Sequence, residues 1–265
     1  MVGRVDPDRY GPWALVVGGS EGVGAEFAEQ LADAGLGVVL VARTEATLRE
    51  TADRLRDRGA QVRTVAVDLL AADAGDRIAA VTDDLEVGLL ILNAGANTYG
   101  HPFVGGDLAR HTDVLTLNVV RQMELVHRYA APMRERGRGG VILVGSLSGY
   151  VGSPHEGVYA ASKAFSRVFA EGLWAELAPH GVDVVELVLG VTRTPAMARA
   201  GLDFDLPGLR VAEPRDVAAE GLEHLADGPV WVAGGNYPMA QKRSGFPRDR
   251  LVAGAAAAVA EMMGR

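Results

Sequence analysis

The sequence predicts a doubly wound α/β domain, in which a parallel sheet of about seven strands is covered by helices on both faces. The first observation behind this prediction is that short, nearly continuous apolar runs alternate with longer amphipathic stretches along the chain. Such runs are typical of strands buried on both faces of a parallel sheet. The second is that the 265 residues contain no repeat, no low-complexity linker and no change of composition that would separate two domains. We therefore expect a single domain over residues 1–265.

Each strand is predicted from an apolar run, and each helix from apolar residues at helical spacing. The expected strands are 13–17, 38–41, 62–67, 89–92, 141–144, 182–188 and 229–232. The expected helices are 22–34, 44–58, 73–84, 107–131, 157–178 and 214–226. Residues 193–213 form a long connection after the sixth strand, and because connections of this length are usually functional, we expect a lid over the substrate. Residues 234–265 are expected to begin irregularly and to end in an Ala-rich helix at about 246–263.

Composition excludes several classes of protein. Hydrophobic residues at 48% and charged residues at 23% are ordinary for a soluble globular protein, and a net charge of −8 argues against a nucleic-acid binder. The chain has no cysteine, which excludes disulfides and thiol nucleophiles, and its six histidines lack metal-ligand spacing, so we expect no metal. Residues 1–10 lack the apolar segment of a signal peptide, and the apolar stretch 251–259 is too short to span a bilayer. We therefore expect a cytoplasmic protein without a membrane span.

Tyr159 and Lys163 are the most informative pair in the chain. They stand four residues apart in an expected helix, so their side chains share one face. The chain has only one other lysine, Lys242, so this spacing has little chance of arising at random. Alone, the pair could be surface residues of an amphipathic helix. Ser146, just after the expected strand 141–144, and a glycine-rich turn near the N-terminus favour an active site instead.

The glycine-rich turn lies between the first expected strand and the first expected helix. Gly18, Gly22 and Gly24 permit a tight turn and close approach of the backbone to a phosphate, and the following helix N-terminus favours the charge of a pyrophosphate. The spacing is Gly-x-x-x-Gly-x-Gly rather than the usual Gly-x-Gly-x-x-Gly. We expect a dinucleotide to bind here, and the turn also contains Ser20, Glu21 and Val23.

The end of the second expected strand predicts which dinucleotide is bound. A ribose with a free 2′-hydroxyl is usually held by a carboxylate at this point, and Ala42 offers none. Arg43 follows directly and could pair with a 2′-phosphate, for which a guanidinium is well suited. Glu45 lies too far into the helix to serve the ribose. NADP(H) is therefore favoured over NAD(H), the alternative being that Arg43 is simply solvated.

Taken in order, these residues resemble the short-chain dehydrogenase/reductase family, from Trp13 to about Val232. The resemblance rests on motifs spread along the chain: Gly18/Gly22/Gly24, Asp68-Leu69, Asn93-Ala94-Gly95, Asn118, Ser146, Tyr159 with Lys163, and Gly190-Val191-Thr192-Arg193-Thr194. It implies a Rossmann-type fold and contacts of Asp68 and Leu69 with the adenine. It also implies that Asn93, Ala94 and Gly95 pass beside the cofactor ribose. The segment containing Val191, Thr192 and Thr194 would hold the nicotinamide carboxamide.

The resemblance also assigns roles in catalysis. Tyr159 would exchange a proton with the substrate oxygen during hydride transfer. A phenol has a pKa near 10, which is too high for efficient proton exchange at neutral pH, and we expect the nearby Lys163 ammonium to favour the phenolate. Lys163 would also bind the nicotinamide ribose. Ser146 would hydrogen-bond the substrate oxygen. Asn118 would hold a water that links Lys163 to solvent, the alternative being a buried polar residue that satisfies helix backbone.

The sequence departs from the family pattern at three positions, and none of them is a catalytic group. Val17 replaces a Thr before the first glycine, Leu92 replaces the first Asn of Asn-Asn-Ala-Gly, and Leu189 replaces a Pro before Gly190. The first two remove hydrogen bonds that tie loops to the sheet. The third frees the chain direction at the nicotinamide.

We therefore expect an NADP(H)-dependent oxidoreductase that interconverts a ketone and a secondary alcohol. The alternatives are the same cofactor acting on another bond, such as an imine, an enone or a transient ketone in a rearrangement, or a redox-silent NADP(H) sensor. The loops expected to form the pocket carry apolar residues, which favour a mostly apolar small-molecule substrate: Tyr99, Phe103, Tyr150, Val151, Met197, Phe204 and Leu206. The expected helices 107–131 and 157–178 carry more apolar surface than one sheet face covers, so we expect a homodimer or homotetramer.

Overall fold

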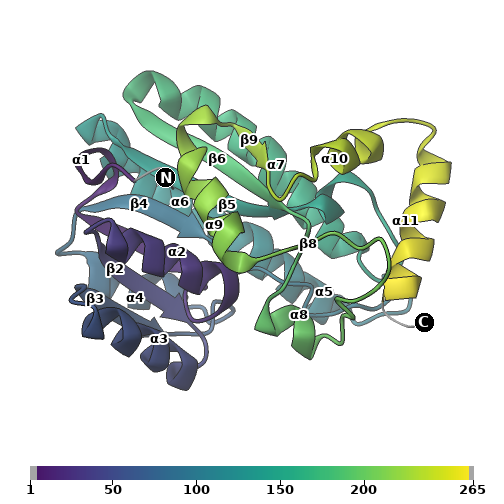
Figure 1. The fold of residues 1–265 in the computed structure, drawn as a ribbon, viewed down its shortest axis with the longest axis horizontal. Coiled ribbons are helices and arrows are strands. Elements are labelled where there is room, and N and C mark those ends of the chain that lie inside the picture. The colour runs from purple at the N-terminus through teal and green to yellow at the C-terminus, as the bar shows by residue number, and fades with distance from the viewer. Residues whose placement is uncertain (1–4, 263–265) are drawn as a thin grey trace.

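All seven expected strands form one parallel sheet in the computed structural model, which describes residues 5–262. Their bounds are β1 Trp13–Val17, β2 Gly37–Ala42, β3 Val62–Ala66, β4 Val87–Leu92, β5 Gly139–Ser146, β6 Val182–Leu189 and β9 Val230–Val232. They lie in the order β3-β2-β1-β4-β5-β6-β9 (Figure 1). A separate two-stranded parallel sheet pairs β7 Val191–Thr192 with β8 Val211–Ala212. The prediction of a doubly wound parallel sheet is confirmed.

The strand order reverses at β1, which has β2 on one side and β4 on the other. Val17 is level with Val41 of β2 and with Leu92 of β4, so these three strands end at the same edge of the sheet. In open α/β sheets, ligands bind outside the carboxyl ends of the strands at such a switch point. The glycine turn, Arg43 and Asn93 all emerge at this edge.

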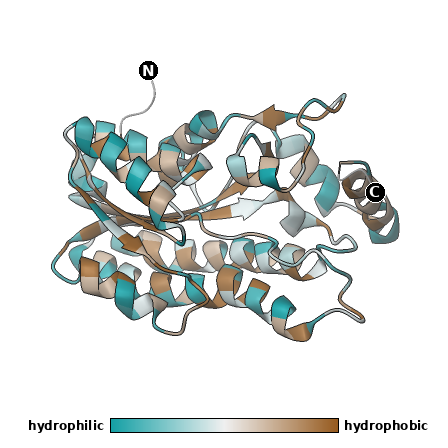
Figure 2. Ribbon diagram, turned by 90° about the horizontal axis from the view of Figure 1, so that it is seen from below, coloured by the Kyte–Doolittle hydropathy of each residue, from teal (hydrophilic) through white to brown (hydrophobic). Residues whose placement is uncertain are grey.

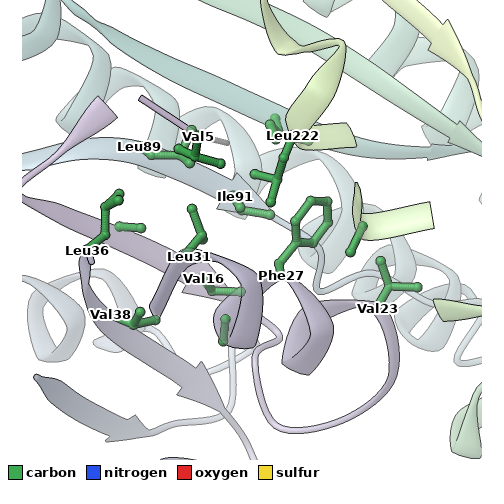
Figure 3. Close-up of a cluster of buried hydrophobic side chains, with 14 of the residues drawn as sticks. Val5, Val16, Val23, Phe27, Leu31, Leu36, Val38, Leu89, Ile91 and Leu222 are labelled. Carbon is green, nitrogen blue, oxygen red and sulfur yellow. The ribbon is translucent and has the colours of Figure 1, made fainter. Parts of the chain in front are cut away.

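Helices cover both faces of the sheet. The first face is covered by α2 Gly22–Asp33, α3 Glu45–Asp57 and α9 Pro214–Glu223, and the second by α4 Ala74–Thr82, α6 Arg121–Arg136 and α7 Gly157–Leu177. Figure 3 shows the core of the first face, where Phe27 and Leu31 of α2 lie near Val16 of β1 and Leu222 of α9. Figure 2 shows that the helices mix hydrophobic and hydrophilic residues, as expected when one side of each helix faces the sheet and the other faces solvent.

The predicted helix 107–131 is present and runs from Leu108 to Arg136, but a π-helical turn interrupts its regular α-helical hydrogen bonding. It consists of α5 Leu108–Leu115, a π-helical turn Thr116–Val120 and α6. The side-chain amide of Asn118 in this turn donates to the carbonyl of Val114, 2.9 Å away, where a regular α-helix would place a backbone N–H. Single π turns inside helices are frequent at functional sites. The sequence pattern did not reveal it because periodicity does not show where a side chain replaces a backbone donor.

Residues after 190 contain more regular structure than expected. The segment 193–213 includes α8 Pro195–Arg199 as well as β8. The segment 234–265 begins with a turn at 234–236, as expected, but the helix α10 Tyr237–Ser244 that follows was not predicted; it has a proline in its first turn, a position that proline favours. The C-terminal helix is present as α11 Arg248–Met262, and its expected last residue, 263, lies outside the described residues.

At the other end, α1 Pro7–Tyr10 is an unpredicted short helix, and residues 1–4 of the predicted N-terminal segment lie outside the described part of the chain. Within residues 5–262, the structure has no helix that combines the length and the apolar character needed to cross a membrane.

Candidate active site

The glycine turn is packed against the loop that follows β4. Gly18 and Gly22 have φ values of +89° and +56°, in the left-handed region that favours glycine. A Cβ on Gly18 would lie 2.6 Å from the backbone nitrogen of Ala94. The side-chain amide of Asn93 donates to the carbonyl of Gly18 at 2.8 Å, and the backbone N–H groups of Asn93 and Ala94 both donate to the carbonyl of Val17. Backbone and Asn93 contacts thus tie the two loops together.

The first turn of α2 can receive an anion. Its N-cap residue, Glu21, makes no capping hydrogen bond through its side chain, so this carboxylate does not satisfy the first N–H groups of the helix. A Cβ on Gly24 would collide with the carbonyl of Gly18, so only glycine allows the turn to fold this closely onto the helix. This cradle fits a pyrophosphate, which needs close backbone approach and N–H donors.

The expected adenosine end of the cofactor site contains one exposed cation. Arg43 directly follows β2 and makes no hydrogen bond or ion pair with any residue in 5–262. Asp68 is also exposed, and its carboxylate accepts the backbone N–H of Leu70 at 3.0 Å. Leu69 is buried, with its side chain in the core of the second sheet face. Arg43 therefore has the exposure that recognition of a 2′-phosphate requires.

Asn118 and Lys163 meet at Gly95. Lys163 is only 3% exposed, and its Nζ donates to the carbonyl of Val144 at 2.9 Å. The Asn118 amide nitrogen donates to the carbonyls of Ala96 and Val114, at 3.0 and 2.9 Å, whereas its Oδ1 has no hydrogen-bonding partner among the described residues. A Cβ on Gly95 would lie 2.6 Å from Oδ1 and 3.1 Å from Nζ. One point beside Gly95 is therefore within hydrogen-bonding reach of both side chains.

Ser146 and Tyr159 come from neighbouring elements. Ser146 is the last residue of β5, its Oγ accepts the backbone N–H of Ser148 at 3.1 Å, and Tyr159 lies in the first turn of α7. Burial raises the pKa of Tyr159 to about 12, and the Ser146 hydroxyl acts in the opposite direction. Lys163 Nζ is 5.7 Å from the centre of the Tyr159 ring. We expected Lys163 to be the group that favours the phenolate, but in the protein alone Ser146 has that effect and burial outweighs it.

The expected nicotinamide segment adjoins the glycine turn. Thr194 caps α8, its Oγ1 accepting the backbone N–H of Met197 at 3.3 Å, and its methyl group lies 3.1 Å from where a Cβ of Gly22 would stand. Arg199, at the end of α8, forms an ion pair with Glu21, with an Nη1 to Oε2 distance of 2.9 Å. Glu21, predicted as a cofactor-binding residue, therefore also fastens the segment 193–213 to the turn. Thr192 is buried and Val191 half-buried in β7.

Two loops at the carboxyl edge are linked through His155, which precedes Tyr159. His155 is the one residue other than glycine with a positive φ, +66°, in the described range 5–262, and its carbonyl accepts a hydrogen bond from Asn97 at 3.3 Å.

Among the expected pocket residues, Tyr99 and Val151 are buried and Phe103 is well exposed. Phe204 lies under the Arg193 guanidinium, 4.9 Å from its ring centre.

Sequence reasoning missed two backbone partners in the site and one buried carboxyl group beneath α7. The carbonyls of Val144 and Ala96 hold Lys163 and Asn118, and no sequence signal identifies a backbone carbonyl as a partner. Glu186 of β6 is 1% exposed beneath α7. It could have been found, because it is an acidic residue at an inward position of a strand whose other inward residues, Val182 and Val184, are apolar.

Comparison with known proteins identifies a family. The family model described as short chain dehydrogenase matches residues 12–203. A 7beta-hydroxysteroid dehydrogenase of Clostridium sardiniense is 32% identical over 248 residues, which are 93% of this chain and 95% of the relative. A solved structure of a 7beta-hydroxysteroid dehydrogenase has a TM-score of 0.85 and 28% identity, covering 98% of this chain and 99% of that one. A short-chain dehydrogenase from Sphingobium yanoikuyae, solved in complex with NADPH, has a TM-score of 0.75 and 31% identity, covering 87% and 92% of the two chains.

Proposed function

This chain belongs to the short-chain dehydrogenase family, and from that premise we propose that it is an NADP(H)-dependent oxidoreductase that interconverts a ketone and a secondary alcohol, with Tyr159 as the acid/base. The observation that carries the proposal is the meeting of Asn118 Oδ1 and Lys163 Nζ at Gly95, with Tyr159 one helical turn before Lys163. Tyr159 provides the proton donor, and Lys163 and Asn118 provide a polar route through which a proton can reach it.

Bound NADP(H) would supply or accept the hydride, and the residues of this chain would handle the proton. With a pKa near 12, the Tyr159 phenol is protonated at neutral pH, which suits a proton donor to the oxygen of a ketone being reduced. The Ser146 hydroxyl beside it can donate to the same oxygen as negative charge develops there. Lys163 would bind the nicotinamide ribose and, with Asn118, pass a proton toward Tyr159.

Arg43 supports the choice of NADP(H). It is exposed at the carboxyl end of β2, where a carboxylate would otherwise hold a ribose hydroxyl, and Ala42 has no such group. A guanidinium there can pair with a 2′-phosphate in a bidentate manner. The related dehydrogenase solved with NADPH agrees with this choice.

The substrate we propose is a mostly apolar ketone or secondary alcohol. The loops at the site carry Tyr99, Tyr150, Val151, Met197 and Phe204, which offer apolar contacts. The relatives with 7beta-hydroxysteroid dehydrogenase activity in their names support a bulky, rigid substrate. We also propose that residues 193–213 form the lid of this pocket.

Oxidation of NADPH against a panel of ketones tests the proposal. The panel should contain 7-oxo steroids, 3-oxoacyl thioesters and small ketones, with imines and enones as the rival bond types. Turnover of at least one ketone, abolished in Tyr159→Phe, is the expected result. Turnover of imines or enones alone would assign the other bond, and NADPH binding without turnover of any compound would favour a sensor.

A further inference from the structure

Glu186 is a buried acidic residue that the proposed chemistry does not use. It lies on β6 in register with Leu143 of β5, on the sheet face covered by α7, and α7 packs against both strands (Figure 1). Its side chain is 1% exposed, and Oε2 has no hydrogen-bonding partner of normal geometry in residues 5–262. Burying an unpaired carboxylate is costly, so such a group is either protonated or compensated by a cation nearby.

The position of the Glu186 carboxyl group is defined by Gly145. A Cβ on Gly145 would collide with Glu186 Oε1 and Cδ, although Gly145 does not have the positive φ that would itself demand glycine. The missing side chain therefore makes room for the carboxyl group against the β5 backbone. Gly145 directly follows Val144, whose carbonyl holds Lys163 Nζ, so Glu186 and Lys163 reach adjacent residues of the same strand.

α7 presents two cations to this region. Lys163 and Arg167 stand one helical turn apart, an arrangement in which like charges repel. The Nε of Arg167 is buried without a partner among the described residues, and its guanidinium lies 4.5 Å from the ring centre of Tyr150. The other titratable groups that face Glu186 are Tyr150, from the short helix after β5, and Glu171 of α7.

From this arrangement we propose that Glu186 is a positioning residue that acts through Lys163, as the buried counter-ion that keeps the Lys163 side chain charged and in place. The role in catalysis rests on the proposed function, whereas the charge relationship does not. Burial shifts both groups toward their neutral forms, lowering the pKa of Lys163 to about 8 and raising that of Glu186 to about 8, and the attraction between the two groups opposes both shifts. Removing the carboxylate should therefore lower the pKa of Lys163.

The charge state of Lys163 can be measured without any assay of activity, because the chain has only two lysines. Protein labelled with ¹³C at the lysine Cε gives two side-chain NMR signals, and Lys242→Arg assigns them. Exposed Lys242 serves as the internal reference. In Glu186→Gln, the Lys163 signal should titrate at least about one pH unit lower than in the wild type. Glu176→Gln, which removes an exposed carboxylate from the same helix, should leave it unmoved.

Glu186→Met provides a second variant if Glu186→Gln fails to fold, since Met is similar to Glu in length and volume and, unlike Gln, buries no amide that needs a hydrogen-bonding partner. Glu186→Met should lower the pKa of Lys163, as Glu186→Gln does. An unchanged Lys163 titration in a folded Glu186 variant would overturn the counter-ion role. This result is independent of whether the protein reduces any ketone.

The catalytic part is tested by the pH dependence of ketone reduction. If charged Lys163 is needed, the loss of rate at alkaline pH should begin at lower pH in Glu186→Gln than in the wild type. The difference in pH should equal the shift in the pKa of Lys163 measured by NMR. Well below this pH, the rate of the variant should be less than about threefold lower than that of the wild type. A structural defect would instead lower the rate equally at all pH values. An NMR shift without a shift in the rate profile would reject the catalytic role and retain the charge relationship.

Discussion

Lys163 Nζ donates a hydrogen bond of 2.9 Å to the carbonyl of Val144, and this bond fastens α7 to β5. Val144 lies two residues before Ser146, so the same contact sets the spacing between Lys163 and the serine at the end of β5. It also leaves the other Lys163 N–H groups to face Gly95 and Asn118. The position of Lys163 is therefore fixed by the sheet before any cofactor binds.

The space at Gly95 can be closed by one methyl group. In Gly95→Ala the new Cβ would lie 2.6 Å from Asn118 Oδ1 and 3.1 Å from Lys163 Nζ, so both side chains must shift. We expect turnover to fall at least about tenfold and the free energy of unfolding to fall by roughly 1–3 kcal/mol. Steady-state kinetics and urea denaturation measure the two effects. Gly75→Ala, on α4 with open space around it among the described residues, is the control and should keep full activity. Unaltered kinetics in Gly95→Ala would argue against a role for this point.

NADPH should bind more tightly than NADH because of Arg43. Arg43→Ala should weaken NADPH binding by roughly 1–3 kcal/mol, the scale of a hydrogen bond to a charged group, and should hardly change NADH binding. Isothermal titration calorimetry measures both. Arg49→Ala, on the exposed side of α3 and paired with Glu45, controls for loss of positive charge. Equal affinities of the wild type for the two cofactors would remove the basis for this assignment.

The ion pair between Arg199 and Glu21 should help to hold the segment 193–213 against the glycine turn. Arg199→Ala should speed limited proteolysis within this segment, and NADPH with a substrate should slow it, because closing over the ligands orders the lid. Peptide mapping by mass spectrometry locates the cuts. Arg128→Ala, which breaks a similar surface ion pair with Asp83, should leave the cleavage pattern unchanged. If neither Arg199→Ala nor the ligands changed the rate of cleavage within 193–213, the lid would be contradicted.

Exposed apolar side chains on α7 and near the start of α6 should be buried between subunits. Val120, Met123, Val168 and Trp174 are each at least 39% exposed in the single chain. Light scattering at micromolar concentration should give a mass of at least twice 27.8 kDa, and Val168→Glu should reduce it. Val104→Glu, at an exposed valine in the loop after β4, is the control. A wild-type mass near that of one chain would show that these faces do not assemble.

The strands were predictable because buried parallel strands are nearly continuous apolar runs, and each strand begins and ends within two residues of its expected bounds. The π turn at Asn118 and helix α10 were not. The first depends on a side chain replacing a backbone donor, and the second follows a Gly-Gly-Asn sequence that suggests a turn.

In the candidate site, the sequence motifs named side chains whose roles stay predictions, and they did not name the partners of those side chains. The structure places Asn118, Lys163, Tyr159 and Ser146 within one region, as their order along the chain suggested. Which carbonyl holds Lys163 depends on how α7 crosses β5, and no residue pattern encodes that contact. Glu186 needed only the observation that one inward position of an apolar strand is acidic.

The central claim is tested most directly by following deuterium from NADPH that carries deuterium at both C4 positions into the products of the ketone panel. For the wild type we predict a secondary alcohol one mass unit heavier, with deuterium at the carbinol carbon. For Tyr159→Phe we predict normal binding of NADPH and a loss of this product by several orders of magnitude, because only the proton donor is removed. A panel that yields no deuterated alcohol, or a Phe variant that keeps more than about a tenth of the wild-type rate, would contradict the account.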